Sequence, residues 1–198
     1  MAFNYLNLPF ESIVLPYDDE ATPIKLMGKK MLPIVEFADG SLSNESLDII
    51  KKMDSANTLS FNLLTEERLT QVNELLSKIG KDVHCLCMPY WMWTPEFNEK
   101  SRKYFQTKKE VKRGPFNKLI LDKETYLKGL EVTLSALESK ITTFYESEEI
   151  SIIDIMIASH LWGMFIFPEF QFSNKIFDYL QRIKKECNFE YHIDFWKD

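Results

Sequence analysis

The stretch "KKMLPIVEFADGSLSNES", Lys29 to Ser46, decides how the fold of this sequence is interpreted. Pro33 has no amide proton, so it is excluded from a central strand but allowed at the first residue of one. The apolar run from Pro33 to Phe37 predicts such a strand. Asp39-Gly40 is typical of a hairpin turn, and Glu45-Ser46 stands where the chain enters a helix. The stretch therefore predicts a proline-led hairpin that leads directly into a helix.

The residues before this stretch predict one more strand and a short helix. Phe10 to Pro16 contains the apolar run Ile13-Val14-Leu15, which predicts a buried strand. Thr22-Pro23 predicts a helix start and Gly28 its left-handed end, so we expect a helix over residues 23–27. The first 55 residues thus predict a small α/β domain.

Residues after the hairpin are helical in pattern. Thr65 is the expected N-cap of one helix, and a second carries apolar residues spaced three and four apart from Leu127 to Phe144. A third begins at "SIID", where Ser151 and Asp154 predict a capping box. A last helix covers roughly residues 174–187. We therefore expect a small domain over residues 1–55, a linker over 56–64 and an all-helical domain over 65–198.

Composition excludes several classes of protein. The chain has 198 residues, 45% of them hydrophobic and 27% charged, with a net charge of −6. An acidic chain is unsuited to nucleic acid, and the longest apolar stretch, Ile155 to Phe167, is shorter than the ~18 residues of a membrane span. Cys85, Cys87 and Cys187 are too few, and odd in number, for a disulfide framework. We expect a soluble, cytoplasmic protein with no nucleic-acid or membrane partner.

The order of these elements resembles the glutathione transferase superfamily, and within it the bacterial glutaredoxin 2 family. The resemblance rests on Leu-Pro before a strand, a hairpin, Glu-Ser at a helix start and the "SIID" box, together with "DDEATPIKLMGKKMLPI", "ESLDII" and "KSRKYFQTKKE". It covers nearly the whole chain. It implies a glutathione transferase-like fold, with an α/β thioredoxin-like N-terminal domain and an all-α C-terminal domain.

The resemblance also implies a glutathione site. Leu32-Pro33 becomes a cis-proline turn in which the backbone of Leu32 pairs with the cysteinyl backbone of glutathione, like an added strand. Glu45 accepts from the α-ammonium of the γ-glutamyl end. Ser46, at a helix N-terminus, receives its carboxylate. One of the lysines near this region (Lys25, Lys29 and Lys30) is a candidate for the glycine carboxylate, although a solvated cluster explains each of them as well.

One feature of the family is missing. Its members carry Cys-Pro-Tyr-Cys after a first strand, whereas this sequence has no Cys-x-x-Cys. We therefore expect a truncated thioredoxin-like domain with an incomplete sheet, and no catalytic residue within this chain. The expected function is glutathione-dependent thiol-disulfide exchange, with glutathione as co-substrate and protein disulfides or mixed disulfides as partners. The alternative is a non-catalytic glutathione-binding or scaffold protein.

Three other stretches allow a structural and a functional interpretation. "HCLC", residues 84–87, is either a pair of buried structural cysteines, which we favour, or a metal or redox pair. "MPYWMW", residues 88–93, either packs between the domains or lines a thiol site. The basic stretch 99–114 is either a solvated helix face or a docking surface for an acidic protein. No metal site is expected.

Overall fold

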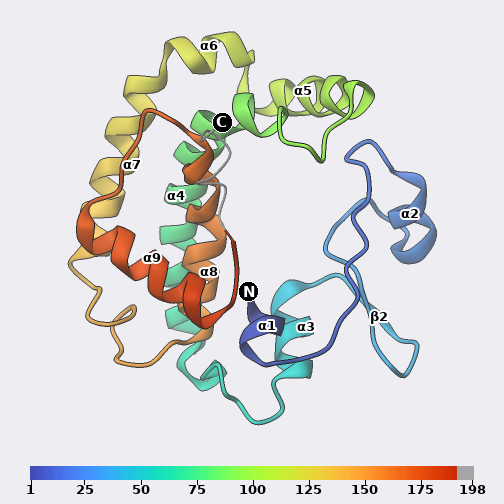
Figure 1. The fold of residues 1–198 in the computed structure, drawn as a ribbon, viewed down its shortest axis with the longest axis vertical. Helices are drawn as coiled ribbons and strands as arrows, with labels where there is room; N and C mark the ends of the chain where they lie inside the picture. Colours follow the sequence, from blue (N-terminus) through green and yellow to red (C-terminus); the bar gives the residue numbers. More distant parts are fainter. Residues whose placement is uncertain (191–198) are drawn as a thin grey trace.

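The computed structural model describes residues 1–190, which form two parts (Figure 1). The small part lies on the right of the view and holds α1 (Ala2–Tyr5), α2 (Ala21–Met27), β1 (Val35–Glu36), β2 (Leu42–Ser43) and α3 (Ser46–Met53). The helical part holds η1 (Phe61–Leu63), α4 (Glu66–Trp91), α5 (Glu99–Arg113), α6 (Phe116–Leu121), α7 (Lys123–Glu138), α8 (Ile152–Leu161), η2 (Trp162–Ile166) and α9 (Asn174–Glu186). The last eight residues of the expected helical domain lie outside the described residues.

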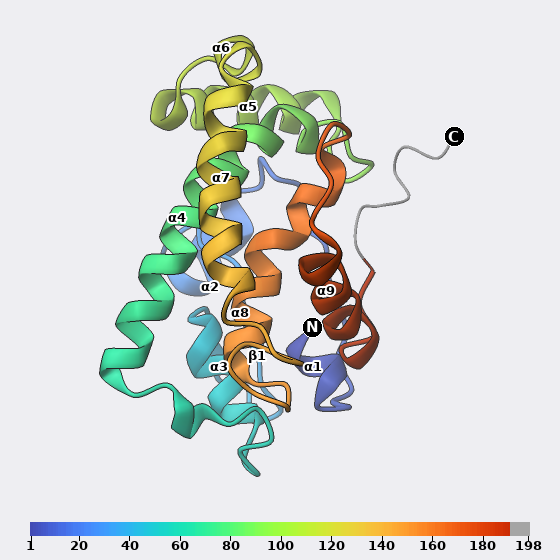
Figure 2. The same cartoon turned by 90° about the vertical axis from the view of Figure 1, so that its left-hand side faces the viewer.

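The helical part is built around α4. This helix packs against α6, α7, α8 and η2, and Figure 2 shows α4 and α7 running side by side. Thr65 caps α4 as expected, since its side chain accepts the backbone N–H of Arg68. The side chains of Val72, Leu76 and Ile79, spaced three and four residues apart on α4, are buried. These contacts make one continuous core that extends to α9.

The expected capping box forms at the start of α8. The Ser151 hydroxyl accepts the N–H of Ile153 at 3.2 Å, and the Asp154 carboxylate accepts the N–H of Ser151 at 2.8 Å. Asp154 also accepts the N–H of Tyr145 and the hydroxyl of Tyr179, at 2.8 and 2.9 Å. A fully buried carboxylate thus joins α8 to α9 and to the loop before α8.

The expected helix from Leu127 to Phe144 is too long. α7 ends at Glu138, and Ile141 and Phe144 lie in an irregular loop, although both are buried in the same core. Their spacing continues the helical period because they face the same core. The bond from Tyr145 N–H to Asp154 and the bridge between Ile141 and Tyr145 use backbone groups that a helix would need.

The hairpin forms where the sequence predicted it. β1 and β2 pair antiparallel, with Val35 opposite Ser43, and Gly40 adopts a φ of 78° in the turn. Gly28 ends α2 with a φ of 73°. The start of α2 differs from the prediction, because the carboxylate of Asp19 accepts the Thr22 N–H and the helix already begins at Ala21.

The predicted buried strand at Ile13-Val14-Leu15 is wrong. Residues 8–16 form neither helix nor strand, and the side chains of Ile13 and Val14 are 75% and 73% exposed. A strand needs a hydrogen-bonded neighbour, and within residues 1–190 the only sheet is the pair β1–β2. A two-stranded sheet agrees with the expected incomplete sheet, and the truncated thioredoxin-like domain stays a prediction.

The expected linker is anchored rather than free. Both carboxylate oxygens of Asp54 accept backbone N–H groups, those of Thr58 and Leu59, each at 2.8 Å. Leu59 is fully buried, and its carbonyl accepts the N–H of Ile152 at the start of α8. Ala2 of α1 belongs to the same core. The small part is therefore fixed to the helical part at this end.

Candidate functional site

Leu32 presents an unpaired backbone next to the hairpin. Its peptide bond to Pro33 is cis, as the resemblance implied. The Leu32 side chain is 54% exposed, and within residues 1–190 neither its N–H nor its C=O has a hydrogen-bond partner. Since exposed backbone with unpaired groups is able to pair with an added strand, Leu32 offers one donor and one acceptor to an extended ligand.

The start of α3 presents a second set of free groups. Glu45 is the N-cap, but its side chain makes no capping bond, and the first bond of the helix runs from Ile49 N–H to the Glu45 carbonyl. Among the described residues, the N–H groups of Ser46 and the two residues after it therefore have no partner. Free N–H groups and the helix dipole together attract a carboxylate at this end.

An exposed ion pair connects the two segments that carry these groups. Lys29, three residues before Leu32, lies 3.6 Å from the Glu45 carboxylate, measured between Nζ and Oε1. Both side chains are exposed, so the pair is also accessible to a ligand. Of the four predicted site residues, Glu45 and Ser46 thus lie at one helix end, and the ion pair connects this end to the loop that carries Leu32 and Pro33.

The other candidate lysines have different places. Lys30 turns away toward the helical part, where its Nζ donates to the Tyr17 carbonyl at 2.5 Å and lies 4.2 Å from the centre of the Tyr104 ring. Burial lowers the pKa of the Lys30 ammonium, against the raising effect of nearby carboxylates. Lys25 lies in the last turn of α2. Lys29 is the lysine beside Glu45.

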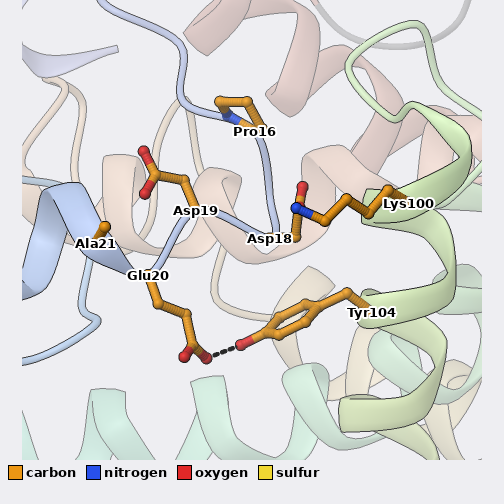
Figure 3. A pocket seen from close by; sticks show the side chains of 7 residues that line it. All are labelled: Pro16, Asp18, Asp19, Glu20, Ala21, Lys100 and Tyr104. Carbon is orange, nitrogen blue, oxygen red and sulfur yellow. Dashed lines mark hydrogen bonds and ion pairs between the residues drawn. The ribbon is translucent and has the colours of Figure 1, made fainter.

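A pocket lies away from these residues, between the small part and α5. Its volume is about 510 Å³, and Figure 3 shows its walls: Pro16, Asp18, Asp19, Glu20 and Ala21 on one side, Lys100 and Tyr104 on the other. None of the four predicted site residues lines it. The hydroxyl of Tyr104 donates to the carboxylate of Glu20 across the pocket.

The bond between Tyr104 and Glu20 is one of several contacts between the small part and α5. Four residues of the small part make these contacts, and we call them the interdomain clasp: Tyr17, Asp18, Glu20 and Lys30. The Tyr17 ring lies 4.8 Å from the Phe105 ring, between centres, and Lys100 Nζ lies 2.8 Å from Asp18. Sequence reasoning missed this clasp. The available signal was charge, since the acidic "DDE" at residues 18–20 complements the basic stretch 99–114.

The aromatic stretch 88–93 is partly buried between the two parts and partly exposed on the surface. Met88 and Met92 belong to an apolar cluster that includes Tyr17, which agrees with packing between the parts. The indole N–H of Trp91 donates to the Gly163 carbonyl at 3.2 Å. Trp93 is exposed and its ring stacks with Arg102.

The three cysteines are buried, as the favoured interpretation of "HCLC" expected. Cys85 belongs to the cluster between α4 and α5, Cys87 faces Met164, and Cys187 follows α9. Burial raises the pKa of all three thiols, that of Cys187 to about 11. Since the thiolate is the reactive form, none of these thiols is poised to attack a disulfide.

Over residues 1–190, no three or more His, Cys, Asp or Glu side chains are grouped so that they could hold a metal ion. Over the same residues, no helix has the length and apolar character needed to span a membrane.

Known proteins match this chain over most of its length. Glutaredoxin 2 from Escherichia coli strain K12 is 29% identical over 190 residues, which is 94% of this chain and 87% of that protein. The crystal structure of glutaredoxin 2 from Salmonella typhimurium in complex with glutathione superposes with a TM-score of 0.83 at 28% identity, over 96% of this chain and 88% of that one. The fold is therefore glutathione transferase-like. The model of the "Glutaredoxin 2, C terminal domain" family matches residues 71–193, and the chain belongs to this family.

Proposed function

We propose that the small part is a thioredoxin-like domain, over residues 1–55, that binds glutathione for thiol-disulfide exchange. The Leu32 backbone and Pro33 take the cysteinyl part of glutathione, and Ser46 and Glu45 take its γ-glutamyl end. Residues 56–64 connect this domain to the helical domain of residues 65–198. A cytoplasmic location, where glutathione and thiols are kept reduced, belongs to the same proposal.

One observation carries this proposal. The unpaired backbone groups of Leu32 and the unpaired N–H groups at the start of α3 belong to two segments that the Lys29–Glu45 ion pair connects. Glutathione has an extended backbone and a carboxylate with a neighbouring ammonium. Leu32 offers a free donor and acceptor for the backbone, α3 offers free N–H groups for the carboxylate, and Glu45 offers an acceptor for the ammonium. The Salmonella relative with glutathione bound supports the same ligand.

We call Leu32, Pro33, Glu45 and Ser46 together the glutathione platform. Thiol-disulfide exchange needs a thiolate next to it. In the reaction a thiolate attacks one sulfur of a disulfide, a new sulfur–sulfur bond forms, and the other sulfur leaves as a thiolate; glutathione then resolves the mixed disulfide. Cys85, Cys87 and Cys187 are buried in the helical part. In this proposal the 198-residue chain supplies the glutathione platform and not the attacking sulfur.

Titration calorimetry with reduced glutathione tests the platform. We expect binding by the 198-residue chain, weakened by Glu45→Gln and by Ser46→Ala. The matched controls are Glu74→Gln and Ser77→Ala, because both residues are exposed on α4, far along the chain from the platform. Equal affinity in all four variants would place the glutathione site elsewhere.

A coupled glutathione assay tests the chemistry. We expect no turnover by the chain as printed, and turnover by a fusion that places a strand and Cys-Pro-Tyr-Cys before Met1. Robust turnover that Cys85→Ser or Cys87→Ser removes would show that "HCLC" is the reactive motif. Binding without turnover in the fusion would instead indicate a purely binding protein.

A further inference from the structure

Helix α5 is strongly basic in an acidic protein. Its fifteen residues include seven Lys or Arg and two Glu, a net charge of +5, whereas the whole chain has a net charge of −6. A concentrated patch of one sign, on a protein of the other sign, attracts oppositely charged partners and orients their approach.

The basic side chains line a groove. It has a volume of about 320 Å³, and its walls are Asp18 together with Lys100, Lys103, Tyr104, Thr107 and Lys108. We call this the α5 groove. The α5 residues among them are three or four apart, so they lie along one face of the helix.

Carboxylates of the chain itself already occupy one edge of the α5 groove. Asp18 pairs with Lys100, and Glu20 pairs with Lys108 at 3.8 Å and accepts the Tyr104 hydroxyl. Tyr17, just before these carboxylates, inserts its ring beside Phe105. Two lysines of the groove, Lys100 and Lys108, therefore pair with carboxylates of the chain itself.

The rest of this face has no occupant among the described residues. Lys103 is exposed and has no ion-pair partner within residues 1–190, and Val111, which follows Lys108 by three residues on α5, is 88% exposed. A free cation and an exposed apolar side chain on the same face complement a segment that contains both carboxylates and apolar groups.

We propose that the α5 groove is the docking site for an acidic segment of a partner protein. The contacts of Asp18 and Glu20 argue for a polypeptide rather than a nucleic acid, because the groups that Lys100 and Lys108 already bind are carboxylates. That this partner is a disulfide-containing substrate rests on the proposed function. The docking itself requires neither glutathione nor a thiol.

Fluorescence anisotropy tests the docking with a short labelled peptide made of repeated Tyr-Asp-Asp-Glu. We expect binding that weakens as salt is raised, because exposed charges are screened beyond roughly 8–10 Å at physiological ionic strength. Lys103→Glu should weaken it about tenfold, since it replaces an attraction with a repulsion. The control is Lys78→Glu, an exposed lysine of α4 with no ion-pair partner in residues 1–190, which should bind the peptide almost as well as the wild type.

Several results would overturn the proposal. These are an absence of peptide binding, an equal loss in the Lys103→Glu and Lys78→Glu variants, and tighter binding of a single-stranded oligonucleotide than of the peptide. Sedimentation that shows a dimer dissociated by Lys103→Glu would assign the face to a second copy instead. Glutathione titration of Lys103→Glu should match the wild type, so a failure of the platform and a failure of the groove are distinguishable.

Discussion

The helical part and the small part differ in how they satisfy their own groups. Around α8, Asp154 is fully buried and its carboxylate accepts four hydrogen bonds. In the small part, Ile13 and Val14 are exposed, and Leu32 has unpaired backbone groups among residues 1–190. The first region is closed by its own contacts, whereas the second leaves groups available to something else. Binding is therefore expected where the chain leaves its own structure incomplete.

The largest expected effect lies in the closed region. Asp154→Ala removes four buried hydrogen bonds, from the donors of Tyr145, Ser151 and Tyr179, and we expect a loss of about 3–5 kcal/mol of unfolding free energy. Urea unfolding measures it, with Asp178→Ala, an exposed aspartate of α9, as the control. A loss no larger than that of the control would show that the buried carboxylate is not what joins these elements.

An isoleucine replaced by alanine in each part compares the packing of the helical part with that of the small part. Ile157 of α8 is fully buried, so Ile157→Ala should cost about 2–5 kcal/mol by loss of packing. Ile13→Ala should change stability by less than about 0.5 kcal/mol, because Ile13 is 75% exposed. Equal destabilisation in the two variants would mean that residues 10–16 are packed in solution.

We expect His84, on α4 of the helical part, to make the unfolding free energy depend on pH. Burial, followed by the nearby Arg113 guanidinium, lowers the pKa of His84 to about 4. Because the unfolded chain then binds the proton more readily, the stabilisation is full above pH ~6.5 and is lost as the pH falls toward about 4. Allowing for solvent screening of a partly exposed ring, we expect about 1–2 kcal/mol.

His84→Gln tests this pH dependence in urea unfolding at a series of pH values. The variant should lose less stability than the wild type between pH ~6.5 and ~4, since Gln has no proton to gain. Parallel curves for the two proteins would show that another group carries the acid sensitivity.

The smallest effect is expected at the helix cap. Ser151→Ala removes the hydroxyl that accepts the Ile153 N–H, and a lost cap costs ~1 kcal/mol. Ser159→Ala, in the interior of the same helix, is the control for the change of side chain. An unchanged denaturation midpoint would contradict a formed capping box.

The sequence predicted features that depend on a few neighbouring residues. Gly28, Asp39-Gly40 and the "SIID" box specify local backbone geometry, and each was found in its expected place. Prediction failed where a distant partner decides the outcome. Ile13-Val14-Leu15 has strand-forming residues but no neighbouring strand within residues 1–190.

In the candidate site, too, local features were predicted and contacts between distant residues were not. The cis bond at Leu32-Pro33 was implied by the resemblance and is confirmed. The roles of Leu32, Glu45 and Ser46 in binding stay predictions. The interdomain clasp was missed, because it joins Tyr17 to Phe105 across nearly half of the chain, and its signal in the sequence was the opposite charge of two distant stretches, residues 18–20 and 99–114.

The most direct test of the account is a glutathione titration followed residue by residue, by ¹H–¹⁵N correlation spectra of the labelled chain. We predict that the amide signals of Leu32 and Ser46 shift together with a single affinity, while those of α7 and α8 stay in place. Shifts concentrated at residues 84–87, with none at Leu32 or Ser46, would contradict the glutathione platform.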